Sequence, residues 1–217
     1  MLTIKDLFDL DHTIAKDYLA QFTYPWEALA GIKDFILSVG PTLEDYDEVS
    51  PQVWVHKTAT VAPTAFLGGP CIIGPETEVR HCAFIRGSAL VGAGCVVGNS
   101  VELKNVILFD GVQTPHYNYV GDSILGYKSH MGAGSITSNV KSDKLPVIVR
   151  CGDERIDTGR KKVGAMLGDF VEVGCNSVLN PGSVIGRHSI IYPTSCVRGV
   201  LAENRIHKND GTVLSRK

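Results

Sequence analysis

Residues 55–109 read VHKTAT VAPTAF LGGPCI IGPETE VRHCAF IRGSAL VGAGCV VGNSVE LKNVIL F when they are set out in groups of six. Every group begins with a bulky apolar residue, and its fifth position is mostly small. The same period continues from Leu125 to Thr137 and from Leu167 to Val197. A repeat this long has to be explained first, because it decides the fold.

A period of six predicts a chain wound as a three-sided prism. Each group of six supplies a short strand and a turn, and three groups make one coil. The apolar residue points inward and stacks on its counterparts in the coils above and below, about 4.8 Å away. A β-sandwich would instead alternate with a period of two and place turns every 8–12 residues. The sequence therefore predicts a mainly β protein built as a single parallel β-helix.

Composition and charge exclude several classes of protein. The 217 residues are 44% apolar and 20% charged, which suits one globular domain with a buried core. A net charge of −2 speaks against a nucleic-acid partner. Asp6 and Asp9 interrupt the first apolar stretch, and no run is long enough to span a membrane. We expect a cytoplasmic protein whose six cysteines are reduced.

The N-terminal segment, 1–48, does not share the repeat. Thr3 and Asp6 have the spacing of a capping box, which predicts a short helix. A second helix is predicted from Pro25 to Gly40, with an apolar face formed by Leu29, Ile32 and Ile36. We expect residues 1–48 to be a helical cap over an open end of the prism, 49–205 to be the β-helix, and 206–217 to be a tail.

The repeat is interrupted twice, and function is best sought at such breaks. The interval from Phe109 to Leu125 is not a multiple of six, so the phase slips over Asp110–Ile124. Residues from about 140 to 163 fit no group of six, which predicts an ejected loop. This loop carries seven basic residues against four acidic ones between Lys141 and Lys162. Such a loop suits a phosphorylated small molecule, although a solvated loop without a role is the alternative.

The groups of six resemble those of the hexapeptide-repeat transferases. That resemblance implies a left-handed parallel β-helix that assembles as a homotrimer, with active sites between neighbouring prisms. The motifs PHYNYVGD (115–122) and GAGSITSN (132–139) are similar to the acetyltransferase domain of bifunctional N-acetylglucosamine-1-phosphate uridyltransferases. The stretch DTGRKKVGAMLGD (157–169) is closer to prokaryotic sugar-1-phosphate nucleotidyltransferases that carry the same β-helix.

The resemblance implies an acyltransferase that moves an acetyl group from acetyl-CoA to the amine of an amino-sugar 1-phosphate, such as glucosamine 1-phosphate. The nucleotidyltransferase half of those enzymes needs about two hundred residues and a glycine-rich phosphate loop. Residues 1–48 are too few to supply it. We therefore expect the acetyltransferase activity without the fused nucleotidyltransferase domain.

Individual roles follow from the matching motifs. His116 corresponds to the catalytic base, a role that an imidazole can fill near neutral pH. Asn139 completes the catalytic set, and Tyr119 contacts the sugar. A lysine of the ejected loop also belongs to the pattern, and both Lys144 and Lys162 fit it. The coenzyme side is formed by the backbone around Ala133, with Cys175 and Pro193.

Two positions depart from the family. His130 stands where the family has an asparagine that contacts the substrate, and Cys175 replaces a serine. His130 is consistent either with a different sugar or with a loss of activity.

Arg86 and Lys104 suggest a phosphate site on physical grounds. They are separated by three groups of six and should lie on neighbouring coils. Two like charges about 4.8 Å apart repel unless an anion lies between them. The family uses an arginine and a lysine at these places for the sugar phosphate.

Two other functions are compatible with such a fold. The γ-type carbonic anhydrases share it and bind zinc through histidines, two of them five residues apart; no pair of histidines here has that spacing, so no metal is expected. The alternative is a non-catalytic module that binds sugar phosphates or sugar nucleotides, or assembles a partner, related to UDP-N-acetylglucosamine pyrophosphorylase. His116 together with Tyr119 and Asn139 weighs against that alternative.

Overall fold

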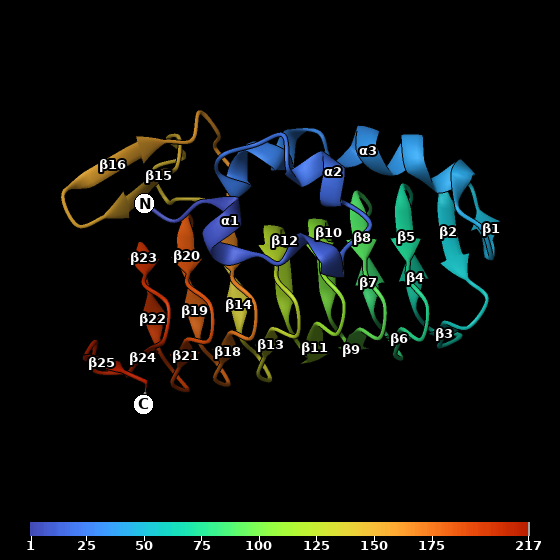
Figure 1. Ribbon diagram of the computed structural model, residues 1–217. Helices are drawn as coiled ribbons and strands as arrows, with labels where there is room; N and C mark the ends of the chain where they lie inside the picture. Colours follow the sequence, from blue (N-terminus) through green and yellow to red (C-terminus); the bar gives the residue numbers. More distant parts are fainter. Residues whose placement is uncertain (217) are drawn as a thin grey trace.

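The computed structural model describes residues 1–216, and its centre is a parallel β-helix with three faces (Figure 1). The first face contains β2 (Val53–His56), β5 (Cys71–Ile73), β8 (Ala89–Val91), the second halves of β10 (Glu102–Leu108) and β12 (Tyr119–Leu125), β17 (Ala165–Leu167), β20 (Ser183–Ile185) and β23 (Val200–Leu201). The second face contains β3 (Thr60–Val61), β6 (Glu78–Val79), β9 (Val96–Asn99), β11 (Gln113–His116), β13 (His130–Met131), β18 (Glu172–Val173), β21 (Ile190–Ile191) and β24 (Arg205–His207). The third face contains β4 (Phe66–Leu67), β7 (Phe84–Ile85), the first halves of β10 and β12, β14 (Ile136–Thr137), β19 (Val178–Leu179) and β22 (Cys196–Val197).

The apolar residue of each group of six forms the core of this β-helix. Val55 pairs with Ile73, and Ile73 with Val91, each step spanning three groups of six along the chain. These side chains are buried, so each coil covers the apolar surface of the next. The predicted left-handed parallel β-helix is confirmed.

The phase slip of the repeat begins earlier in the chain than predicted. Leu108, not Phe109, pairs with Val91 on one side and with Leu125 on the other. Phe109 is buried as well, but its ring packs 5.1 Å from the ring of Phe8. The slip therefore does not occupy the whole of Asp110–Ile124: one part lies before this range, in β10, and the other lies within it, in β12.

The shortening occurs at two corners between the third and first faces. The apolar residues follow at an interval of five in β10 (Leu103 to Leu108) and again in β12 (Val120 to Leu125). Asn105 and Asp122 sit at these corners with φ of 55° and 48°, a left-handed conformation that Asn and Asp tolerate better than most residues. Each corner is one residue tighter than a regular one, and the two lie on neighbouring coils.

The N-terminal segment lies along the side of the β-helix, not across its end, so the expected end cap is wrong (Figure 1). Asp9 donates its N–H to Asp169 at 2.7 Å, and the carbonyl of Leu29 accepts a hydrogen bond from Asn105 at 3.2 Å. The segment shares one apolar core with the coils, which explains why it covers their side. The open edge of β2 is instead covered by β1 (Tyr46–Ser50), which pairs with it antiparallel.

The helices of this segment are shorter than predicted. The capping box of Thr3 and Asp6 is present at α1 (Ile4–Leu7). The expected helix from Pro25 to Gly40 is divided at Gly31 into a 3₁₀ helix, η2, and α3. The remaining elements follow in chain order: η1 (Leu10–His12), α2 (Lys16–Leu19), η2 (Pro25–Ala30), α3 (Ile32–Val39) and η3 (Gly40–Thr42).

The ejected loop lies between β14 and β17 and forms an antiparallel hairpin of β15 (Ile148–Cys151) and β16 (Glu154–Asp157). A bridge between Val140 and Lys162 closes its base. The hairpin lies next to the last coils, beside β23 (Figure 1). Within the expected C-terminal tail, β25 (Val213–Ser215) folds back antiparallel on β24; Lys217 lies outside the described residues.

Candidate active site

The tight corner between the third and first faces gathers several polar side chains around Asp122. Its carboxylate is 2% exposed and accepts hydrogen bonds from Lys104 Nζ at 3.0 and 3.2 Å. The side-chain amides of Asn105 and Asn139 donate to it at 2.9 and 2.6 Å. One ammonium and two amides thus compensate a buried charge that would otherwise be costly.

Asp122 is not among the residues predicted from the sequence. Its carboxylate contacts Lys104 and Asn139 because the corner stacks the coils before and after its own on either side of it. The sequence did contain a signal for it. Asp122 follows Lys104 by three groups of six, which places it on the neighbouring coil, and it stands at the shortened interval between Val120 and Leu125.

The predicted register of Arg86 and Lys104 is confirmed, but the electrostatic argument drawn from it is wrong. Ile85 pairs with Leu103, which places the two cations on neighbouring coils. Arg86 forms an ion pair with Glu102 at 2.7 Å, and Lys104 one with Asp122 at 3.0 Å. Each positive charge has a carboxylate of its own, so their proximity does not require an anion between them.

Tyr119 and Asn139 meet at the same corner. The Asn139 amide donates to the Tyr119 hydroxyl at 3.1 Å as well as to Asp122. Burial, together with the negative charges of Glu102 and Asp122, raises the pKa of Tyr119, so its hydroxyl stays protonated and can donate to a ligand. Gly121 leaves room for this contact, because a Cβ there would lie 2.5 Å from the Tyr119 hydroxyl and 2.9 Å from Asn139 Nδ2.

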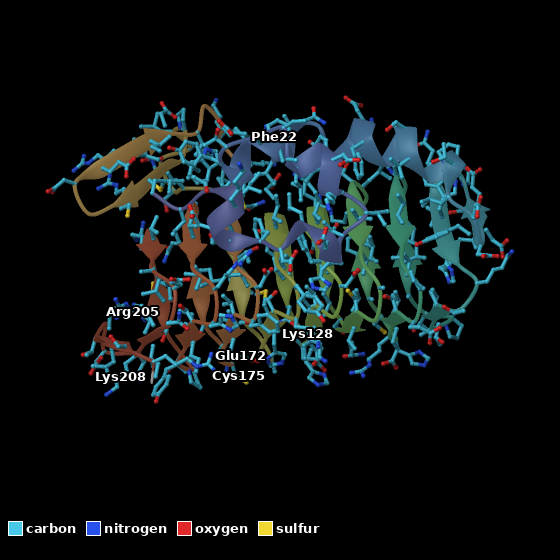
Figure 2. The ribbon with its side chains drawn as sticks, in the orientation of Figure 1. Phe22, Lys128, Glu172, Cys175, Arg205 and Lys208 are labelled. Carbon is cyan, nitrogen blue, oxygen red and sulfur yellow. The ribbon has the colours of Figure 1, made fainter. Side chains whose placement is uncertain are left out.

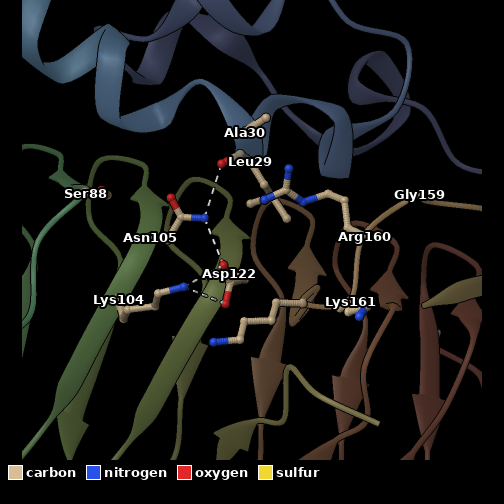
Figure 3. A pocket seen from close by; sticks show the side chains of 10 residues that line it. Leu29, Ala30, Ser88, Lys104, Asn105, Asp122, Gly159, Arg160 and Lys161 are labelled. Atoms are coloured by element: carbon tan, nitrogen blue, oxygen red, sulfur yellow. Dashed lines mark hydrogen bonds and ion pairs between the residues drawn. The ribbon is translucent and has the colours of Figure 1, made fainter. Parts of the chain in front are cut away.

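A cavity of about 550 Å³ opens beside Asp122 (Figure 3). Leu29 and Ala30 of the N-terminal segment form one wall, and Lys104 and Asn105 form another. The ejected loop supplies the third wall, Gly159–Lys162, with three consecutive cations, Arg160, Lys161 and Lys162.

The cavity carries excess positive charge. Within residues 1–216 none of these three loop cations has a carboxylate within 4 Å, and Nε of Arg160 is buried without a hydrogen-bond partner. Asp122 is the one carboxylate among the residues that line the cavity. Of the two lysines considered from the sequence, Lys162 lines this cavity, whereas Lys144 does not.

His116 lies at the corner that precedes the Asp122 corner along the chain, between the second and third faces. It ends β11, and its side chain is exposed, with no hydrogen bond to another described residue. His116 precedes Tyr119 by three residues, so the two stand at the start of the third face. The imidazole is free to accept a proton from a ligand bound on this face.

The three residues expected on the coenzyme side form a column with His116. The carbonyl of His116 accepts a hydrogen bond from Gly134 at 3.0 Å, and that of Ala133 accepts one from Asn176 at 2.9 Å. The carbonyl of Cys175 in turn accepts one from Thr194 at 2.9 Å, beside Pro193. Successive turns of the corner thus place Ala133, Cys175 and Pro193 in a row. Cys175 marks this row at the edge of the β-helix that lies away from the helices (Figure 2).

His130 stands apart from the Asp122 corner. It lies in β13 on the second face, where its Nδ1 is 2.9 Å from Glu172 Oε2. Together they line an open cavity of about 600 Å³, with Gln113, Lys128 and Phe170 among the other lining residues. The structure therefore places His130 on a different face from Tyr119 and Asn139.

Neither a metal centre nor a membrane-spanning helix is found in residues 1–216. No group of three His, Cys, Asp or Glu side chains in this range is arranged as metal ligands would be. No helix in the same range is long and apolar enough to cross a membrane.

Comparison with known proteins agrees with this fold. The family of the GMPPB C-terminal domain matches residues 68–148. The chain is 31% identical over 207 residues to the bifunctional protein GlmU of Methanococcus maripaludis, an alignment that covers 93% of the chain and 50% of that relative. The chain is a hexapeptide-repeat β-helix domain related to these bifunctional proteins.

This β-helix domain spans half the length of that relative. It is also 37% identical over 94 residues to the bifunctional sugar-1-phosphate nucleotidylyltransferase/acetyltransferase of Sulfurisphaera tokodaii, with 43% of the chain and 23% of the relative aligned. Among solved structures, a hexapeptide transferase family protein from Anaplasma phagocytophilum superposes with a TM-score of 0.44 at 16% identity, over 76% of this chain and 79% of that one.

Proposed function

We propose that this β-helix domain is an acetyltransferase that moves an acetyl group from acetyl-CoA to the amine of an amino-sugar 1-phosphate. The observation that carries the proposal is the pairing of a free imidazole, His116, with the Asp122 corner and its cationic cavity at the two edges of one face. The relative from Sulfurisphaera tokodaii is named as a nucleotidylyltransferase and acetyltransferase, which supports the same reaction class.

His116 supplies the base that the chemistry needs. A protonated amine has no lone pair, so the imidazole must first remove a proton from it. The amine nitrogen then attacks the thioester carbonyl, the new C–N bond forms, and the C–S bond breaks. The proton returns to the CoA thiolate, and the backbone N–H of Ala133, which has no partner among residues 1–216, stabilises the oxyanion that develops on the carbonyl.

The Asp122 corner positions the sugar phosphate. Lys104 and Lys162 bind the phosphate from two walls of the cavity, because a dianion is best held by cations on several sides. The Tyr119 hydroxyl donates a hydrogen bond to the sugar, and Asp122 holds Asn139 in place. Arg86 pairs with Glu102, the register neighbour of Tyr119, so we assign it to the border of the sugar site.

Acetyl-CoA is assigned to the column of Ala133, Cys175 and Pro193. This column begins at His116, so a thioester bound there brings its carbonyl towards the base. We expect the active form to be a homotrimer whose neighbouring subunit closes the cleft, and we expect it to act in the cytoplasm.

Release of CoA thiol tests the proposal. Protein incubated with acetyl-CoA and glucosamine 1-phosphate should release thiol, and His116→Ala should lower kcat at least about a hundredfold, the usual share of a general base. The matched control is His81→Ala, since His81 is an exposed histidine on the same corner two coils earlier. A wild type that binds acetyl-CoA but acetylates no amino-sugar phosphate would favour the non-catalytic module.

A further inference from the structure

A second cationic cavity lies on the other side of the ejected loop, between the β15–β16 hairpin and the last coils. It has a volume of about 200 Å³ and is lined by Lys141, Ile148, Arg150, Pro181, Arg198 and Gly199. It shares no lining residue with the cavity beside Asp122. Three of its six lining residues are cations, and none is a carboxylate.

The charges around this cavity are poorly compensated. Lys141 pairs with Asp143 at 3.0 Å. Arg198 donates to the neutral Asn180 side chain, at 3.0 Å. Across residues 1–216, no carboxylate oxygen lies within 4 Å of Arg150 or Arg198.

The hairpin adds a fourth positive charge. Arg150 stands directly opposite Arg155 in the antiparallel pair of β15 and β16. Residues directly opposite each other point to the same side of a hairpin, and like charges there are destabilising. Asp157 is on that side too, opposite Ile148, but its carboxylate accepts the N–H of Gly159 and reaches neither arginine.

We propose that this cavity is an anion site that binds a phosphate group, either as free phosphate or as a phosphomonoester. It differs from the Arg86–Lys104 pair, where each cation already has a carboxylate. The two guanidinium groups of Arg150 and Arg198 offer several donors in fixed planes, the geometry that suits phosphate oxygens, whereas Lys141, already paired with Asp143, only borders the cavity. The small volume fits a phosphate group with little else attached.

The proposed site is independent of the acetyltransferase reaction. Its residues come from the hairpin and the last coils, whereas the sugar phosphate is assigned to Lys104 and Lys162. Binding here would link the hairpin to the β-helix and would make its stability depend on phosphate.

Binding of inorganic phosphate to the full chain tests the proposal, measured by calorimetry at constant ionic strength with acetate as the comparison anion. The double variant Arg150→Ala/Arg198→Ala should bind phosphate at the proposed site at least about tenfold more weakly than the wild type. The double variant Lys161→Ala/Lys162→Ala and the control Lys33→Ala should bind phosphate at this site as the wild type does. Both arginines are exposed, so the variant should fold, as circular dichroism can confirm.

Thermal unfolding gives a second readout that does not depend on calorimetry. In phosphate-free buffer, Arg150→Ala should raise the Tm, because it removes a repulsion with Arg155, and it should reduce the rise in Tm that phosphate gives the wild type. A glucosamine 1-phosphate titration then separates the two sources of the anion: competition with phosphate at this site indicates a phosphomonoester, and no competition indicates free phosphate. Unchanged phosphate binding in the double arginine variant, or equal binding of acetate, would overturn the proposal.

Discussion

At the scale of single residues, Asp122 explains why the candidate site has its shape. It is buried at a tight corner and holds Lys104, Asn105 and Asn139 together. Lys104 is held at the corner by its ion pair with Asp122, and Asn139 is directed towards Tyr119. A single carboxylate therefore fixes the positions of groups from the two coils on either side of its own.

Gly121→Ala tests whether the Tyr119–Asn139 contact positions the substrate. The added Cβ would meet the ends of both side chains, so they should move apart while the backbone stays in place. We expect kcat/KM for glucosamine 1-phosphate to fall about tenfold to a hundredfold, with little change in the free energy of unfolding. Gly31→Ala is the control, because its Cβ would likewise meet a tyrosine hydroxyl, that of Tyr18, at 2.7 Å. Equal kinetics in the two variants would argue against this role of the contact.

The sequence could predict which residues lie on neighbouring coils, but not all of their partners. The interval of three groups of six placed Arg86 beside Lys104 correctly. Asp122 stands at the same interval from Lys104 and could have been assigned to it. Glu102 could not be assigned to Arg86, because the two are 16 residues apart, an interval that the repeat does not indicate. The candidate roles of His116, Tyr119 and Asn139 came from a resemblance and remain predictions.

At the scale of elements, β10 and β12 create the site because each crosses a corner without a regular turn. A regular corner, such as Arg86–Ser88, places three residues between Ile85 and Ala89. In β10 only Lys104 and Asn105 separate Leu103 from Val106. The tighter path leaves space that the N-terminal segment and the ejected loop border but do not fill.

The ejected loop offers a direct comparison of two lysines. Lys162→Ala should raise the KM for glucosamine 1-phosphate at least about tenfold, because a charge-assisted contact contributes about 1.5–3 kcal/mol. Lys144→Ala should leave the KM unchanged, since Lys144 does not line the cavity. Initial rates at varied sugar-phosphate concentration give both values. A larger effect of Lys144→Ala would show that the loop binds substrate with its other end.

The elements differ in how well the sequence predicts them. The ladder from Val55 to Leu103 is local and periodic, so its strands follow from the pattern alone. The N-terminal helices begin where the capping box at Thr3 and the proline at position 25 predict, but no local sequence pattern indicates which surface of the β-helix they cover. Their position depends on the apolar surface that the completed coils expose.

At the scale of the whole molecule, the third face carries aromatic side chains as well as the candidate site. Phe66 and Phe84 lie on neighbouring coils with ring centroids 5.5 Å apart, and they are 58% and 43% exposed. Paired exposed aromatics are common where protein surfaces meet. They support the expectation that a second subunit packs against this face.

Light scattering tests the assembly. The wild type should have three times the chain mass of 23.4 kDa, and Phe66→Ser/Phe84→Ser should shift it towards a single chain. The control is Ile14→Ser, an exposed apolar residue of the N-terminal segment, which should leave the trimer intact. A wild type of single-chain mass would exclude a shared cleft.

The central claim is that one face of the β-helix holds an amino-sugar phosphate between His116 and the Asp122 corner. A crystal structure with glucosamine 1-phosphate and CoA tests it most directly. The account predicts the phosphate within hydrogen-bond distance of Lys104 and Lys162, with the amine facing His116 and the CoA sulfur beside Ala133. A sugar phosphate bound elsewhere, with its amine remote from His116, would contradict it.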